Sequence, residues 1–199
     1  MEIVTYVDNL WILIAGILVM FMQPGFMLVE TGFTRSKNSV NIVMKNFMDF
    51  SVGALTYWAF GFAFAYGGST LGGFIAYGNF FLEGDSSTYF FQVVFAATAA
   101  TIVSGSVAER TKFSSYLLFQ PFICGLIYPI VTHWVWSGQG WLTDIGFVDF
   151  AGSGVVHMVG GFAALAGIQV VGPRIGKFDS NGKPLPIPGS SMVAAALGV

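Results

Sequence analysis

Asp149 and His157 stand eight positions apart in the sequence, and an apolar run extends from His157 to about Val171. A histidine is costly to bury inside an apolar segment long enough to cross a membrane, so it is a candidate functional residue. Neutral imidazole donates a hydrogen bond from one ring nitrogen and accepts one at the other. His157 therefore has the chemistry to hold a small polar solute or relay a proton. Its position fits equally well with a core histidine that bonds to a neighbouring helix.

Asp149 directly precedes the start of this apolar segment. A carboxylate at such a place accepts hydrogen bonds from the free backbone N–H groups of a helix start and meets the positive end of the helix dipole. This structural role is the favoured interpretation. The same negative charge would favour cations at an external vestibule, and the two roles are compatible.

The other candidate functional residues are aromatic. Phe91 and Phe95 are four residues apart and share one helix face, which favours a packing stripe over an aromatic constriction in a pore. Trp134 and Trp136 end an apolar run, as is typical of the aromatic belt at a membrane surface. The alternative for the tryptophans is a cation–π surface for an arriving cation.

The amino-acid composition indicates whether these residues lie in a membrane protein or in a soluble one. The 199-residue chain is 55% hydrophobic and 9% charged, with a mean hydropathy of +0.73. Soluble domains are about 25% charged, so this is the composition of a polytopic membrane protein. No basic stretch indicates nucleic-acid binding, and the single Cys124 excludes a disulfide within the chain. No spacing indicates a metal site, a phosphate loop or a nucleophile with its base, so we expect neither an enzyme nor a cofactor.

The apolar runs predict an all-α fold, because about 20 apolar residues cross a bilayer as a helix. We expect five transmembrane helices and the start of a sixth, at about residues 10–29, 47–66, 89–108, 115–136, 153–171 and from 190. Gln23-Pro24-Gly25 predicts a kink or a close packing point in the first helix. The sixth helix stops after about ten residues, too few to span a bilayer. We therefore expect the chain to be a fragment of a longer protein.

The positions of lysine and arginine indicate how the chain is oriented in the membrane. With these helices, all eight cations fall in loops on one side of the membrane, at Arg35, Lys37, Lys45, Arg110, Lys112, Arg174, Lys177 and Lys183. The loops on the other side carry Glu83, Asp85 and Asp144. Because cytoplasmic loops are enriched in lysine and arginine, we expect the N-terminus outside.

Further charged residues lie near the inner ends of the expected helices. Glu109 with Arg110, and Glu30 with Arg35, predict short cytoplasmic turns with local ion pairs. Asp49 is expected at the inner interface or slightly within the membrane, paired with a neighbouring lysine or arginine.

Five segments, read together, resemble the Amt/Mep/Rh superfamily of ammonium transporters. They are residues 30–38, 91–95, 108–113, 133–136 and 149–157, which come in the family's order along most of the chain. Residues 30–32 are more similar to the plant, animal and cyanobacterial branch than to the enterobacterial one. The resemblance implies eleven helices, of which the first ten form two inverted five-helix repeats with a pore between them. This chain would be the first repeat and the start of the second, without the C-terminal half.

The resemblance also implies a role for each candidate. Trp136 and Phe95 would help to recruit ammonium at the outer vestibule, with Phe91 nearby. Phe95 would be one of two stacked gate phenylalanines. Asp149 would support the site without binding the ion directly, and His157 would be the first of two pore histidines. The second histidine, the second gate phenylalanine and a polar recruitment residue would lie beyond the end of this chain.

The function implied by this resemblance is ammonium transport through a hydrophobic, histidine-lined pore in which ammonia and a proton cross separately. The alternatives are an ammonium-sensing membrane domain fused to a signalling domain, a related gas channel, and a non-conducting fragment. The implied partners are ammonium or ammonia, the lipid bilayer of the cell membrane, further copies of the chain in a homotrimer, and a cytosolic PII-type regulator.

Overall fold

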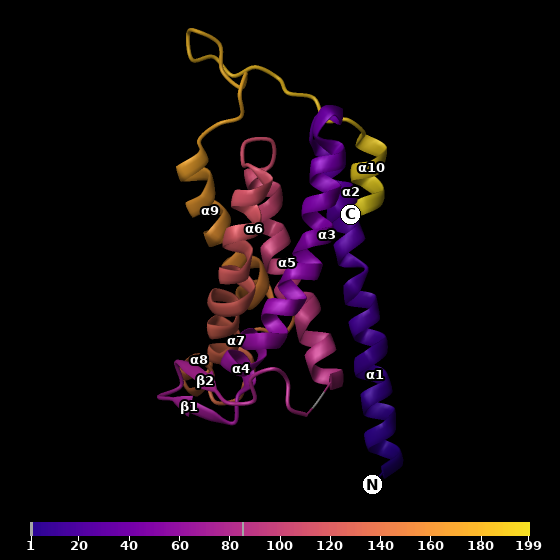
Figure 1. Ribbon diagram of the computed structural model, residues 1–199, viewed down its shortest axis with the longest axis vertical. Helices are drawn as coiled ribbons and strands as arrows, with labels where there is room; N and C mark the ends of the chain where they lie inside the picture. Colours follow the sequence, from indigo (N-terminus) through magenta and orange to yellow (C-terminus); the bar gives the residue numbers. More distant parts are fainter. Residues whose placement is uncertain (1, 85) are drawn as a thin grey trace.

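The computed structural model describes residues 2–84 and 86–199, whose helices run side by side along one long axis (Figure 1). Asp85, one of the acids expected in the outer loops, lies outside these residues. The α-helices are α1 (Glu2–Met20), α2 (Met22–Phe33), α3 (Ser39–Thr56), α4 (Phe62–Tyr66), α5 (Ser86–Val107), α6 (Phe113–Phe122), α7 (Tyr128–Trp136), α8 (Trp141–Asp144), α9 (Val159–Val171) and α10 (Met192–Gly198). A 3₁₀ turn covers Ser36–Asn38, and π-helical segments cover Tyr57–Gly61, Ile123–Ile127 and Ser153–Met158.

The fold is the expected helical membrane fold, with one small addition. β1 (Ser69–Leu71) and β2 (Ile75–Tyr77) form an antiparallel hairpin in the loop after α4, with Thr70 opposite Ala76. The hairpin and α8 lie at the same end of the bundle as the N-terminus (Figure 1). β2 packs against α4 and α7, and α8 packs against α7.

The first expected helix is longer than 10–29 and is interrupted at Phe21, between α1 and α2. Proline has no N–H to donate to the carbonyl four residues earlier, and its ring clashes with that carbonyl. For Pro24 that carbonyl belongs to Met20, where α1 ends. Pro24 thus explains the interruption, which lies three residues before the kink expected at Gln23-Pro24-Gly25.

A second proline explains the π-helical segment between α6 and α7. Pro129 cannot bond to the carbonyl of Gly125, and the chain widens to a π-helix over Ile123–Ile127 before α7 continues. Together α6, the π segment and α7 act as one long helix in place of the expected 115–136.

Within the described residues, four stretches of helix are both long and apolar enough to cross a membrane: residues 3–33, 86–107, 113–144 and 153–171. The segment 39–66 is also part of the bundle, but it carries Lys45, Asn46 and Asp49 on buried positions. It begins eight residues before the expected 47. Lys45 therefore lies inside a helix, and its expected place in a cytoplasmic loop is wrong.

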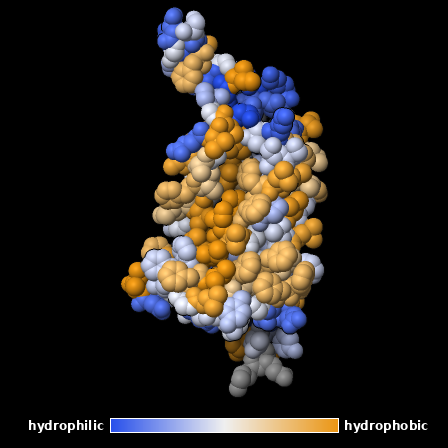
Figure 2. All heavy atoms as spheres, turned by 60° about the vertical axis from the view of Figure 1, so that its left-hand side comes forward, coloured by the Kyte–Doolittle hydropathy of each residue, from blue (hydrophilic) through white to orange (hydrophobic). Residues whose placement is uncertain are grey.

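α5 is the centre of the bundle and packs against α1, α2, α3 and α9. Its inner residues are small: Ala96, Ala97, Ala99 and Ala100 are completely buried. Small residues let membrane helices approach closely, where dispersion contacts hold them together. The outer surface is apolar instead, and Figure 2 shows a middle band of apolar side chains with hydrophilic ones towards the ends.

α10, the start of the expected sixth helix, packs against α2 (Figure 1). Ser191 begins it, and the Ser191 hydroxyl accepts the N–H of Ala194 at 3.1 Å. Gly32 makes the approach possible, because a Cβ there would lie 2.6 Å from the backbone nitrogen of Ala195. The chain after α9 thus returns to the first helix of the bundle.

Candidate functional site

Phe91, Phe95 and Trp136 form a continuous aromatic row at the N-terminal end of α5. The rings of Phe91 and Phe95 meet edge-on with centroids 5.1 Å apart, and Phe95 meets Trp136 edge-on at 5.7 Å. All three side chains are half-buried. The i, i+4 spacing on α5 thus brings the two phenylalanines together, and the C-terminus of α7 adds the tryptophan. The row is partly accessible, as a binding surface must be.

Trp136 connects this row to Asp149, because its indole N–H donates to the Asp149 carbonyl at 2.7 Å. The Asp149 carboxylate accepts four backbone N–H groups at the start of the next helix. Oδ1 takes those of Gly152 and Ser153 at 2.7 and 3.1 Å, and Oδ2 takes those of Gly154 and Val155 at 2.8 and 2.7 Å. The carboxylate thus holds the helix start.

These hydrogen bonds decide the charge of Asp149. Burial raises the pKa of Asp149, but the four backbone N–H groups outweigh burial and hold the pKa below its usual range. Gly152 makes the tight turn with a φ of +97°, which strongly favours glycine. Both carboxylate oxygens are thus engaged by the backbone, which is the structural role favoured from the sequence.

His157 lies in the π-helical segment that Asp149 holds, and its side chain is exposed. Its neighbours Val155 and Val156 point into the core and are almost completely buried. Within the described residues no hydrogen bond reaches the imidazole ring. The interpretation of His157 as a satisfied core histidine is therefore wrong for this chain. A π-helical segment is often found at a functional site, where it re-aims a side chain.

The satisfied core histidine is His133, for which the sequence offered no role. Its Nδ1 lies 2.9 Å from the Ala65 carbonyl and its Nε2 lies 2.8 Å from the Thr70 hydroxyl. Because a carbonyl only accepts, Nδ1 carries the proton and Nε2 accepts from Thr70. Trp134 donates to the Phe74 carbonyl at 2.7 Å. Both residues attach α7 to the hairpin, and His133 also attaches it to α4.

We expect His133→Phe to lower the free energy of unfolding by roughly 1–3 kcal/mol, because the Ala65 carbonyl and the half-buried Thr70 hydroxyl lose their bonds to the buried ring. Thermal unfolding of the purified protein in detergent measures this. His157→Phe is the matched control, since the His157 ring is exposed and has no hydrogen bond among the described residues. Equal losses of stability in the two variants would contradict the assignment.

The sequence interpretation missed a buried polar cluster between α2, α3 and α5. Glu30 was expected in a cytoplasmic turn with Arg35, but it is 6% exposed and accepts from Asn46 at 3.2 Å and Ser104 at 3.1 Å. Asp49 is completely buried and accepts from Thr101 at 3.2 Å. The available signal was the spacing of Lys45 and Asp49, four residues apart on one helix face.

Glu109 connects three segments at the opposite end of the bundle from the N-terminus. Its Oε1 accepts the Arg35 side-chain Nε–H at 2.8 Å and the Asn38 amide at 2.7 Å, and Oε2 lies 3.1 Å from Arg174 Nη1. The local pairing expected with Arg110 is wrong, because Arg110 donates instead to the carbonyls of Ser106 and Gly172. The ends of α2, α5 and α9 are held together here.

The charge of Glu109 makes this junction sensitive to pH. Burial raises the pKa of Glu109, but hydrogen bonds from Arg35 and Asn38 and the charge of Arg174 outweigh burial and lower it. A lowered carboxyl pKa stabilises the fold fully above the usual value of 4.5, and this contribution is lost as the pH falls through the lowered value.

We therefore expect the melting temperature to fall between about pH 5 and pH 3 in the parent protein and to fall less in Glu109→Gln. The part due to Glu109 is about 1–2 kcal/mol, because its arginine partners are partly exposed. Glu83→Gln is the control, since Glu83 is exposed in the described structure. A Glu109→Gln variant with the same acid profile as the parent would contradict this role.

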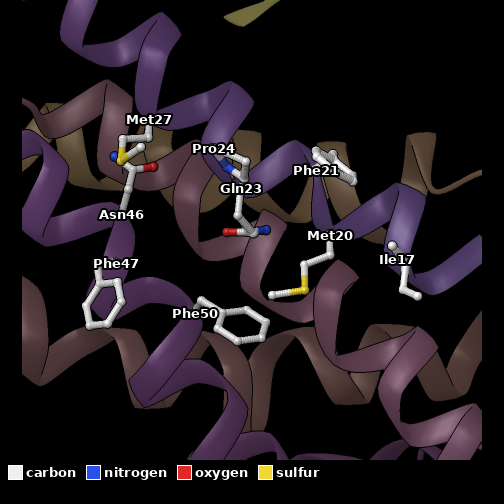
Figure 3. Close-up of a pocket in the computed structure, with 9 residues that line it drawn as sticks. All are labelled: Ile17, Met20, Phe21, Gln23, Pro24, Met27, Asn46, Phe47 and Phe50. Carbon is white, nitrogen blue, oxygen red and sulfur yellow. The ribbon is translucent and has the colours of Figure 1, made fainter. Parts of the chain in front are cut away.

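A separate apolar groove of about 460 Å³ opens between α1, α2 and α3. Figure 3 shows Phe47 and Phe50 on one side and Met20 and Gln23 on the other. The Gln23 amide donates to the Thr98 hydroxyl at 3.0 Å. None of the predicted site residues lines this groove, so we do not include it in the candidate site.

The helical membrane fold, with an aromatic row and an exposed histidine in an apolar helix, defines a polytopic membrane protein. Comparison with known proteins identifies the family. A model described as the Ammonium Transporter Family matches residues 10–199. The chain belongs to the ammonium transporter family.

The relatives are similar in sequence and in structure. The chain is 50% identical to "Ammonium transporter Amt2" of Archaeoglobus fulgidus over 96% of its own length and 44% of the relative's, and 47% identical to "Ammonium transporter Amt1" of Haloferax mediterranei over 96% and 40%. Its structure matches a "Sensor Amt Protein" with a TM-score of 0.95 at 38% identity, over 100% of this chain and 52% of the other.

Candida albicans Mep2 matches with a TM-score of 0.84 at 28% identity, over 96% of this chain and 44% of the other. The chain therefore spans about half the length of the proteins that it matches, or somewhat less. These relatives are transporters and a sensor, not enzymes.

Proposed function

We propose that this chain is the N-terminal part of an ammonium transporter in the cell membrane and carries half of the transport site. The supporting observation is the continuous connection from Phe91 through Phe95 and Trp136 to Asp149. His157 follows on the helix that Asp149 holds, with its ring exposed on the surface of the bundle. This open face is the place where a second repeat would complete a pore.

The orientation follows from the two ends of the bundle. Glu109 pairs with Arg35 and Arg174, so the loops after α2, α5 and α9 share one end. Because these loops are rich in lysine and arginine, we assign that end to the cytoplasm and the N-terminus to the outside. The aromatic row then lies at the outer mouth and His157 deeper in the membrane.

The arrangement has a consistent chemistry for ammonium. The faces of Phe95 and Trp136 attract a cation, and the partial exposure of the row leaves room for it. An unpaired cation in an apolar pore is unfavourable, so the ion loses its water and then a proton. Ammonia continues along the imidazole of His157, whose ring nitrogens are hydrogen-bonding groups. The proton crosses separately.

The proposed transport site needs a second repeat, which would follow this chain in the full-length protein. We propose that the second repeat supplies a second pore histidine and a second gate phenylalanine. By analogy with the family, three copies would assemble, each with its own pore, and a cytosolic PII-type protein would regulate them. The apolar surface of the bundle is compatible with contacts to lipid and to further copies.

A second candidate is ammonium sensing, favoured by the close structural match to the "Sensor Amt Protein". In a sensor, ammonium would shift the balance of two conformations by binding one of them more tightly. A soluble output domain after the last helix would then be expected.

Reconstitution of the full-length protein in liposomes tests transport directly. An inward ammonium concentration step should produce a current and uptake of labelled methylammonium. Ammonium binding without current or uptake would favour sensing, and uptake of ammonia without current would favour a gas channel. The absence of binding, current and uptake would overturn the proposed function.

A further inference from the structure

Three ionisable side chains are buried together in the cytoplasmic half of the bundle, away from the aromatic row and His157. Glu30, on α2, is 6% exposed, and Lys45 and Asp49, on α3, are 1% and 0% exposed. Charged groups inside a membrane are unfavourable and mark ion or proton pathways more often than structural sites. The chemistry of the outer site uses none of the three.

Two of the three side chains are well satisfied. Asp49 accepts hydrogen bonds from the hydroxyls of Thr101 and Tyr116. Lys45 donates to the Ser104 carbonyl at 3.3 Å, and its ammonium lies 4.9 Å from the centre of the Tyr116 ring. These contacts hold Lys45 and Asp49 in place, and Lys45 acts on Glu30 through its charge.

Glu30 is satisfied on one side only. Its Oε2 accepts from the amide of Asn46 and the hydroxyl of Ser104. Its Oε1 is buried and has no hydrogen-bond partner among the described residues. A buried carboxyl oxygen without a partner is costly, which indicates that another group bonds to it in the working protein.

Space beside Glu30 is available for such a group. Glu30 lines a pocket of about 370 Å³ together with Thr101, Gly105, Ser106 and Arg174. Gly105 keeps the carboxylate uncovered, since a Cβ there would lie 3.4 Å from Oε1. Glu30 lies one helical turn before Phe33, where α2 ends, on the side that the proposed orientation assigns to the cytoplasm.

We propose that Glu30 is the proton donor and acceptor of the inner half of the transport path, and that its Oε1 exchanges the proton with ammonia or water in this pocket. The proposal rests on the proposed function. The carboxylate takes a proton from a hydronium ion, forming an O–H bond and leaving water. Arriving ammonia then takes that proton, so that the O–H bond breaks, an N–H bond forms, and ammonium leaves towards the cytoplasm.

The surrounding charges suit a group that changes its protonation. On α3, the ammonium of Lys45 stabilises the Glu30 carboxylate, and the Asp49 carboxylate opposes it. Tyr116 on α6 and Arg174 after α9 are the other titratable or charged groups on this side. α5 lines the pocket of Glu30 with hydroxyl side chains, Ile102 and Gly105, none of them charged. Glu30 thus has a cation and a carboxylate near it on α3 and a further cation, Arg174, at its pocket.

Glu30→Gln in the full-length protein tests the proposal, because glutamine keeps the shape and the contact with Ser104 but cannot exchange a proton. We expect the ratio of ammonium-evoked current to methylammonium uptake to fall about tenfold or more, since a positioned proton donor contributes about 10²-fold or more to a proton transfer. Glu30→Asp should recover part of the ratio with a shifted pH profile. Glu83→Gln, an exposed carboxylate at the other end of the bundle, should leave the ratio unchanged.

The outcomes separate this proposal from the proposed function. If the parent protein gives neither current nor uptake, the proposed function fails first. If the parent transports and Glu30→Gln keeps the parent ratio and pH profile, Glu30 is not the proton carrier. If Glu30→Gln and Glu30→Asp lose current and uptake in equal proportion, together with thermal stability, the role of Glu30 is structural and the proposal is overturned.

Discussion

Asp149→Ala is expected to abolish ammonium uptake by the full-length protein and to lower its free energy of unfolding by roughly 2–4 kcal/mol. The carboxylate accepts four backbone N–H groups at the start of the helix that carries His157. Without it, these donors lose their partner, and the Asp149 carbonyl that binds Trp136 moves with the loop. One substitution therefore disturbs both the aromatic row and the histidine.

Uptake of labelled methylammonium and thermal unfolding in detergent measure the two effects. Asp144→Ala is the matched control, because Asp144 is also an acid at this end of the bundle but is exposed. Asp149→Asn should lie between the alanine variant and the parent, since its amide oxygen replaces only one of the two acceptors. Full transport in Asp149→Ala, or an equal loss in Asp144→Ala, would show that the hydrogen bonds of Asp149 do not position the site.

His157→Ala is expected to reduce ammonium-evoked current by roughly 10²-fold, the usual contribution of a positioned proton-transfer group, with little loss of stability. The ring is exposed and unbonded within the described residues, so its removal leaves no buried partner unsatisfied. His157→Asn separates hydrogen bonding to ammonia from proton transfer. Asparagine keeps a donor and an acceptor but does not titrate, so uptake without current in this variant would assign proton transfer to the histidine.

Val156→Ala is the matched control for His157. Its side chain points into the core from the same π-helical segment. It should lower stability and keep the current per folded protein. An undiminished current in His157→Ala would remove His157 from the transport path.

The aromatic row and the helix start at Asp149 show what local sequence patterns can predict and what they cannot. The position of Asp149 before an apolar run predicted its role, because a helix start always leaves backbone N–H groups without an intrahelical partner. The spacing of Phe91 and Phe95 predicted their shared face. It did not predict the contact of Phe95 with Trp136, because these residues are on different helices and 41 positions apart in the printed sequence.

The charged residues show where local patterns fail. Lys45 was placed in a loop and Glu30 in a turn, because charge usually marks the end of a membrane helix. In the structure both are buried, since α2, α3 and α5 supply each other with polar partners. Glu109 was paired with its sequence neighbour, but it bonds to Arg35 and Arg174 from two other loops.

The sequence by itself determined the membrane setting, the all-α fold and the family resemblance, since these depend on composition, run length and short motifs. The tertiary structure decided which histidine is free. His133 and His157 are both histidines in apolar runs, and nothing in their immediate sequence separates them. His133 meets the Ala65 carbonyl and the Thr70 hydroxyl, and His157 meets no partner in the described chain, because only packing brings distant polar groups to one ring and not to the other.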